Sequence, residues 1–241
     1  MCSKVKSLSR FNAKTWLKIR TSKVPAEIIT PILDLHKSPT SHCATISLMI
    51  YEPKTFNIPA LEGISAKTIE EHLKLYQGYV KHVNVIHEKI EELKADSEKN
   101  AYALGEVQRR LGFEFGGMKN HEAYFAQFEG GAKEVSPESE LYKSCGYLWG
   151  SWDAFLAQFK AVAMTRGIGW AMLYFDKDAK RLLMTWVDEQ HIGQFTNVNI
   201  VLALDMWEHS YLFDYTPGDK KQYIEAFFKN LNWEVVANRI S

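Results

Sequence analysis

Residues 199–211 read Asn-Ile-Val-Leu-Ala-Leu-Asp-Met-Trp-Glu-His-Ser-Tyr, an apolar run that stops at one acid. We expect a buried strand over 199–204 with Asp205 at its end, beside the core rather than in open solvent. A buried carboxylate is costly unless it is paired or ligates a metal. His209 follows four residues later and can return to the same point. The stretch therefore predicts either a buried Asp–His hydrogen bond or part of a metal site.

The pattern around this stretch predicts further strands and helices. Two more strands are expected, over 169–175 and 181–187, on either side of a turn at Asp176-Lys177-Asp178. Helical segments are expected at 63–99, 102–128 (interrupted at Gly112 and at Gly116-Gly117), 138–165, 207–215 and 220–236. Ser65 is a plausible start signal for the first of them. The first half of the pattern is entirely helical, and the second half has strands enclosed by helices. This order predicts the α+β class, with two layers or two subdomains.

The composition narrows the function classes. The 241 residues are 46% hydrophobic and 24% charged, and no run approaches the roughly 20 apolar residues of a membrane span. Residues 1–48 carry a net charge of +6, so the rest of this neutral chain carries −6. An acidic body argues against nucleic-acid binding, which usually needs a basic face. We expect neither a nucleic acid nor a membrane as a partner.

Residues 1–48 differ from the rest, because they are basic, rich in Ser and Thr, and free of acids before Glu27. This is typical of an organelle transit peptide, but Met49 as the true start is slightly favoured, because the domain pattern begins cleanly there and prolines interrupt 25–39. We treat 1–48 as a disordered extension outside the fold, which leaves domains at 49–135 and 136–241. The three cysteines are far apart and include no CxxC pair, which favours a reducing compartment. We expect a cytoplasmic protein, or one of an organelle matrix if 1–48 is a transit peptide.

Two more histidine segments attract attention, although each is weak evidence alone. His121 ends the segment Gly116-Gly117-Met118-Lys119-Asn120-His121, where glycines beside a histidine suggest close packing. His72 ends Ile64-Ser65-Ala66-Lys67-Thr68-Ile69-Glu70-Glu71-His72, with Tyr76 on the same helical face. A single core histidine is more often structural than a ligand.

Taken together, these segments resemble the iron/manganese superoxide dismutases. The resemblance runs from about Pro59 to the C-terminus, and 205–211 is similar to the most diagnostic motif of that family. Further matching segments occur in the same order, at 64–72, 116–121, 150–155, 167–170 and 232–234.

The resemblance implies a helical hairpin domain followed by an α/β domain with a small antiparallel sheet, and a metal between them. The implied ligands of one Mn or Fe ion per chain are His72, His121, Asp205 and His209, with a solvent molecule as fifth ligand. The implied activity is the conversion of superoxide to O₂ and H₂O₂. The alternative is a metal-free structural or interaction module of the same fold.

The resemblance also implies residues around the ligands. Tyr79 resembles the tyrosine that gates the substrate funnel, with a one-residue gap after His72. A glutamine of the family touches the solvent ligand. Spacing to Asp205 favours Gln190 for that place, and His191 is its rival because some members use a histidine. Gly117 stands where one branch carries the glutamine, which favours manganese or tolerance of either metal.

The resemblance further implies a homodimer, or a tetramer built from it. Glu208 resembles the glutamate that reaches a ligand histidine of the partner subunit. Two family residues that pair across that interface are replaced here, by Tyr76 and Leu212. We therefore expect the hydrogen-bonded relay between them to be absent or rebuilt.

Overall fold

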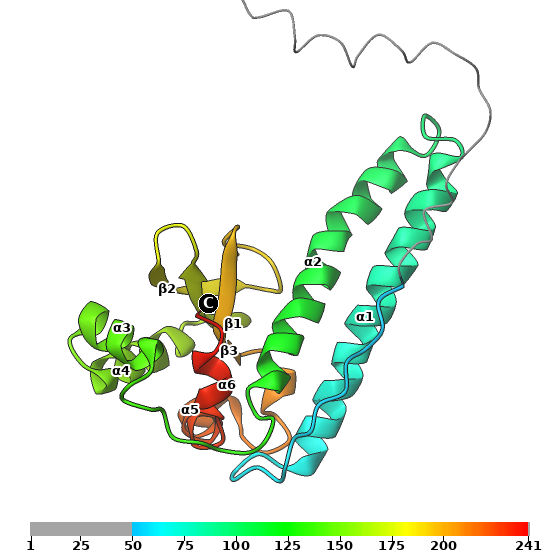
Figure 1. Cartoon of the computed structure of the whole chain (residues 1–241). Coiled ribbons are helices and arrows are strands. Elements are labelled where there is room, and N and C mark those ends of the chain that lie inside the picture. The colour runs from blue at the N-terminus through cyan, green and yellow to red at the C-terminus, as the bar shows by residue number, and fades with distance from the viewer. Residues whose placement is uncertain (1–49, 241) are drawn as a thin grey trace, which may run out of the picture. The chain divides into compact units, whose positions relative to one another are not determined.

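Two long helices, α1 (Ala66–Lys94) and α2 (Ala101–Ala126), lie side by side as a hairpin (Figure 1). This computed structural model describes residues 50–240, so the expectation for 1–48 lies outside the described residues. The backbone N–H of Thr68 donates to Oγ of Ser65 at 3.2 Å, which confirms Ser65 as the N-cap of α1. The boundary expected between 135 and 136 stays a prediction.

Helix α2 is continuous, so the interruptions expected at its glycines are wrong. Glycine inside a helix costs about 1 kcal/mol relative to alanine without breaking it. The glycines instead permit close packing. A Cβ atom on Gly117 would lie 2.5 Å from the ring of Tyr79, and one on Gly116 would collide with the carbonyl oxygen of Gln190. The pair therefore lets α2 approach both the neighbouring helix and the loop at 190.

The second half of the described chain is built on three antiparallel strands in the order β2-β1-β3. The strands are β1 (Gly169–Asp176), β2 (Arg181–Asp188) and β3 (Val198–Asp205). Helices α3 (Glu140–Trp149) and α4 (Trp152–Ala163) pack on β2, and α4 also on β1, while α2 packs against β3. Helices first and a small sheet afterwards confirm the α+β prediction.

The segments after β3 are more broken than the sequence suggests. Only a 3₁₀ turn, η2 (Glu208–Ser210), forms within 207–215, and a second, η3, covers Pro217–Asp219. The helix expected over 220–236 is two helices, α5 (Lys220–Lys229) and α6 (Trp233–Ala237). Asn232 separates them because its side chain accepts hydrogen bonds from the N–H groups of Glu234 and Val235, which starts a new helix.

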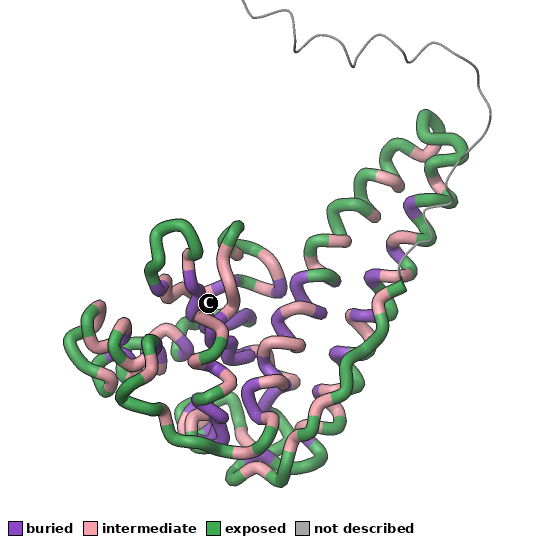
Figure 2. The backbone as a smooth tube through the Cα atoms, viewed as in Figure 1, coloured by how far each residue is buried: buried purple, intermediate pink, exposed green. Residues whose placement is uncertain are grey.

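Burial is concentrated where α2 passes the sheet, and the half of the hairpin near its turn is mostly exposed (Figure 2). In α2 the buried residues begin at Glu114. The last four residues of β3, Leu202 to Asp205, are fully buried. Among the described residues, no helix is long and apolar enough to cross a membrane.

Candidate metal centre

The four residues implied as ligands come from four elements and meet at one point. His72 lies on α1, His121 on α2, Asp205 at the end of β3 and His209 in η2. One ligand atom from each lies within 4.8 Å of the other three. The side chain of His209 is 21% exposed, and the other three are fully buried.

Asp205 stands at the middle of this group. Its Oδ2 atom is 3.1 Å from Nε2 of His72, 3.2 Å from Nε2 of His209 and 3.5 Å from Nε2 of His121. Two ligands that are each about 2.1 Å from one ion, and at right angles about it, lie about 3 Å apart. The separations therefore suit ligation of a single ion.

His121 distinguishes a metal site from a purely hydrogen-bonded cluster. Its Nδ1 lies 2.7 Å from the carbonyl oxygen of Gly117, which can only accept, so Nδ1 carries the proton. Nε2 then presents a lone pair, is buried without a hydrogen-bond partner and faces Oδ2 of Asp205. Two buried acceptors that face each other are unfavourable unless a cation lies between them. Imidazole and carboxylate ligands suit Mn or Fe, so the residues present fit the ion.

Burial and the contacts among the four residues together set the protonation states that a metal requires. Burial, assisted by His72, lowers the pKa of His121 to about 3. Burial lowers the pKa of His72 as well, although Asp205 opposes it. Burial alone would raise the pKa of Asp205, but the charge and hydrogen bonds of the neighbouring histidines hold it well below its usual range. Neutral imidazoles and an ionised carboxylate are the forms that bind metal ions.

Aromatic rings surround the two buried histidines and exclude water from them. The rings with centroids about 5 Å from those of His72 or His121 belong to Tyr79, Tyr124, Phe125 and Trp170. Trp170 is placed by the sheet, because it lies directly opposite Asp205 in the pairing of β1 with β3. Trp207 stacks on His209 at 5.8 Å, so the three clustered histidines have aromatic side chains around them.

Gln190 joins this enclosure through both ends of its side chain. Its Nε2 donates to the hydroxyl of Tyr79 at 3.0 Å, and its Oε1 accepts from Nε1 of Trp170 at 3.0 Å. The side chain is fully buried. Its backbone carbonyl accepts from Nδ2 of Asn120 at 3.0 Å. Contacts from α1 and β1 thus fix the side-chain amide of Gln190, and a contact from α2 holds its backbone.

His191 takes a different position from its neighbour. Its ring packs against Phe113, with centroids 5.8 Å apart, and its buried Nδ1 lacks a hydrogen-bond partner. His191 is not one of the residues whose ligand atoms cluster in the described part of the chain. The structure therefore brings Gln190 and Tyr79 together, whereas His191 packs against Phe113.

Two supporting residues were missed by the sequence interpretation. Gln194 donates to Oδ1 of Asn120 at 2.8 Å and to the carbonyl of Gln190 at 3.0 Å, and so holds that loop. Asp214 accepts hydrogen bonds from the N–H of Ser65 and from the hydroxyl of Thr68, which ties the segment after His209 to the start of α1. No local pattern could have found either residue, since the contacts with Asn120, Ser65 and Thr68 join distant parts of the chain.

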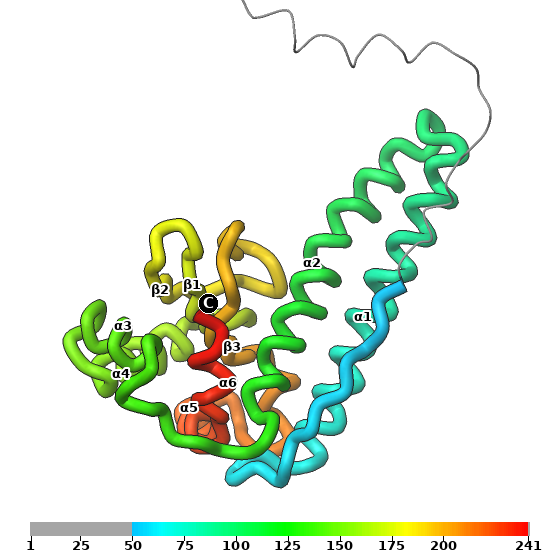
Figure 3. The backbone as a smooth tube through the Cα atoms, in the orientation of Figure 1, coloured from blue at the N-terminus to red at the C-terminus, as the bar shows by residue number. Residues whose placement is uncertain are grey.

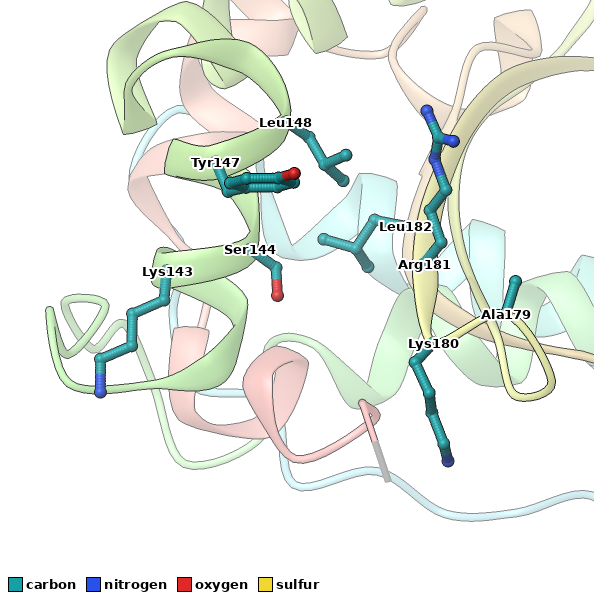
Figure 4. A pocket seen from close by; sticks show the side chains of 8 residues that line it. All are labelled: Lys143, Ser144, Tyr147, Leu148, Ala179, Lys180, Arg181 and Leu182. Atoms are coloured by element: carbon teal, nitrogen blue, oxygen red, sulfur yellow. The ribbon is translucent and has the colours of Figure 1, made fainter.

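A surface pocket between α3 and the β1–β2 hairpin is separate from this centre (Figure 4). Its lining residues are Lys143, Ser144, Tyr147, Leu148, Ala179, Lys180, Arg181 and Leu182. None of them is a predicted site residue, so the pocket has no part in the metal centre.

Two family descriptions match the chain. Residues 53–129 match the alpha-hairpin domain of iron/manganese superoxide dismutases, and residues 137–239 match the C-terminal domain. The first match contains His72 and His121, and the second contains Asp205 and His209. Each domain of that family therefore brings two of the clustered residues.

Individual proteins similar to this chain are named for iron or for manganese. A "Superoxide dismutase [Fe]" of Aquifex pyrophilus is 34% identical over 194 residues, which are 78% of this chain and 90% of the relative. A "Superoxide dismutase [Mn]" of Mycolicibacterium smegmatis is 35% identical over 191 residues, 77% of this chain and 89% of the relative. Iron and manganese proteins are thus similar to this chain to nearly the same degree.

Proposed function

This chain belongs to the iron/manganese superoxide dismutase family, and we propose that it converts superoxide to O₂ and H₂O₂. The ligands proposed for its one Mn or Fe ion are His72, His121, Asp205 and His209. The observation that carries the proposal is the buried pair of acceptors formed by Nε2 of His121 and Oδ2 of Asp205. A bound ion supplies alternating one-electron oxidation and reduction, by which two superoxide ions and two protons become one O₂ and one H₂O₂.

We assign Tyr79 and Gln190 to proton handling. Gln190 donates to the oxygen of Tyr79, so the hydroxyl hydrogen of Tyr79 is free to point to another acceptor. Burial, reinforced by the charges of Asp205 and Glu114, raises the pKa of Tyr79, which keeps the phenol protonated. A proton is thereby held on a fixed oxygen next to the ring of His121. His191 stays the alternative to Gln190, and its contact with Phe113 favours Gln190.

For the choice of metal, we propose a site that tolerates both manganese and iron. The ring of Tyr79 occupies the space that any side chain at position 117 would need. A glutamine reaching the ligands from that position, as in one branch of the family, is therefore incompatible with this packing. The relatives named for iron and for manganese support a site that accepts either ion.

Loading the metal-free full chain with Mn or with Fe, in parallel, tests the function. We expect one ion per chain and superoxide dismutation with at least one of the metals, and the ratio of the two activities gives the preference. Bound metal without activity would contradict the assigned reaction. A protein that binds neither metal would favour the structural module instead.

We further propose that the chain forms a homodimer through the surface around His209. Glu208 is exposed beside this ligand, and the apolar side chains of Leu212 and Phe213 are 46% and 51% exposed on the following turn. Tyr76 is fully buried and its hydroxyl accepts from the N–H of Lys54 at 2.9 Å, which supports the absence of the relay through positions 76 and 212.

Glu208→Ala is expected to weaken the dimer by roughly 30-fold or more. Truncating one partner of a buried, hydrogen-bonded charge costs about 2 kcal/mol or more. Light scattering over a dilution series measures the effect. A wild-type chain that is monomeric at all concentrations would refute the dimer. A wild-type tetramer that dissociates to dimers on dilution would show that the dimer is the building block of a larger assembly.

We propose the cytoplasm as the compartment of the protein. Cys145, the cysteine within the described residues, is free and buried, as is common in reducing compartments. Fractionation of cells that express the full chain checks the proposal. Recovery in an organelle matrix would favour a transit function for residues 1–48.

A further inference from the structure

Strand β3 lies at the edge of the sheet, so one side of its backbone has no neighbouring strand. Its residues Val201 to Asp205 are nevertheless fully buried. Buried backbone N–H and C=O groups need hydrogen-bond partners, because water cannot reach them. The partners on the free edge of β3 must therefore come from outside the sheet.

Gln127 supplies these partners at Ala203. The N–H of Ala203 donates to Oε1 of Gln127 at 2.8 Å, and Nε2 of Gln127 donates to the carbonyl of Ala203 at 2.8 Å. The side-chain amide thus pairs with the strand in both directions, as a residue of a fourth strand would. Gln127 is fully buried and follows directly on the last residue of α2.

Arg239 reinforces the same junction from the C-terminal segment that follows α6. Helix α6 itself packs against β3 (Figure 3). Nη1 of Arg239 donates to the carbonyl of Val201 at 3.1 Å, and its Nη2 donates to the carbonyl of Ala123 at 2.9 Å. Burial lowers the pKa of Arg239 to about 10, so the guanidinium remains charged at neutral pH. One cation therefore bridges β3 and α2 beside the Gln127 amide.

The two elements joined in this way both carry proposed ligands. Ala203 is two residues before Asp205, and Gln127 is six residues after His121. The ligand atoms of Asp205 and His121 are 3.5 Å apart, and ion–ligand distances tolerate changes of about 0.2 Å. A small shift of β3 along or away from α2 would consequently spoil the ligand geometry.

We infer that Gln127 is a positioning residue of the metal centre, which sets the separation of the Asp205 carboxylate from His121 through its pairing with Ala203. The inference rests on the proposed function, because it assumes that these residues bind the ion. Arg239 assists by holding the same two elements together.

The test compares Gln127→Met with the control Asn230→Leu in the full-length chain. Asn230 makes an equivalent two-way pairing, with the N–H and carbonyl of Glu62 at 2.8 Å each, and is also buried. Each replacement is apolar and of similar size, and we expect both to lower the Tm of the metal-free protein. Chelator competition then gives the dissociation constant for Mn²⁺, which should rise about ten-fold in Gln127→Met and stay at the wild-type value in Asn230→Leu.

Each outcome decides the question. An unchanged dissociation constant in Gln127→Met, or an equal rise in both variants, overturns the positioning role and leaves a structural one. A wild-type chain that binds neither Mn²⁺ nor Fe²⁺ overturns the proposed function itself, and with it this inference. If Gln127→Met does not fold, Arg239→Met decides in its place, with a weaker rise in the dissociation constant as the expected result and no rise as the opposing one.

Discussion

His121→Ala is expected to abolish metal binding and superoxide dismutation together. The substitution removes the buried lone pair that faces the Asp205 carboxylate, and with it one of the four proposed ligands. Second-layer residues around metal ions typically change affinity 10–100-fold, so we expect loss of a direct ligand to cost more than about 100-fold. Elemental analysis of the purified protein and an assay of dismutation measure the two effects.

A surface histidine supplies the control for this substitution. His82 has a side chain that is 61% exposed and lies outside the ligand cluster, so His82→Ala should keep both the metal and the activity. Removing a fully buried ring also costs on the order of 2 kcal/mol of folding stability. Urea unfolding of the metal-free variant therefore has to show that it is folded. A folded His121→Ala protein with full activity would refute the ligand assignment.

Local spacing predicted that Asp205 and His209 meet, either as a hydrogen-bonded pair or as part of a metal site. Asp205 and His209 are four residues apart at the end of an apolar run, and η2 returns His209 to within 3.2 Å of the carboxylate. His72 and His121 are separated from them by long stretches of chain, so only the resemblance to a family could join them. Local patterns record neighbours on one element and contain no information about contacts between elements.

The choice between Gln190 and His191 shows why turns are harder to predict than helices. The preceding residue, Glu189, has a φ of +51°, in the left-handed region that non-glycine residues rarely adopt. This conformation helps decide which of two adjacent side chains faces the ligands. Spacing to Asp205 favoured Gln190, but residue type did not separate the two, because both side chains could serve as hydrogen-bond partners.

The glycines of α2 were misinterpreted for a related reason. Gly116 and Gly117 suggested a break, since glycine is a poor helix former. Close packing around His121 was expected from the same glycines, but the residues they pack against, Tyr79 and Gln190, are identified only by the structure. A packing requirement from distant residues outweighed the local propensity, and α2 stayed intact.

Asp205→Asn is expected to remove metal binding while leaving the fold in place. The N–H of Trp207 donates to Oδ1 of Asp205 at 2.8 Å, so the amide oxygen of an asparagine would take that position. Its NH₂ group would then face Nε2 of His72, His121 and His209, where Oδ2 stood 3.1 to 3.5 Å away. The anionic ligand is replaced by a neutral donor, which repels a cation and satisfies histidine lone pairs instead.

The decisive measurement for Asp205→Asn is thermal unfolding with and without Mn²⁺. A ligand that binds only the folded state stabilises it by about 2.7 kcal/mol at a concentration of 100 times its dissociation constant. Metal should thus raise the Tm of the wild type and of the control Asp153→Asn, whose side chain is exposed on α4. It should leave the Tm of Asp205→Asn unchanged. The metal-free variant should unfold cooperatively, because the new amide can donate to histidines that previously faced an acceptor. A metal-induced rise equal to that of the wild type would show that Asp205 is not a ligand, and that its carboxylate serves only to hydrogen-bond the imidazoles of His72 and His209.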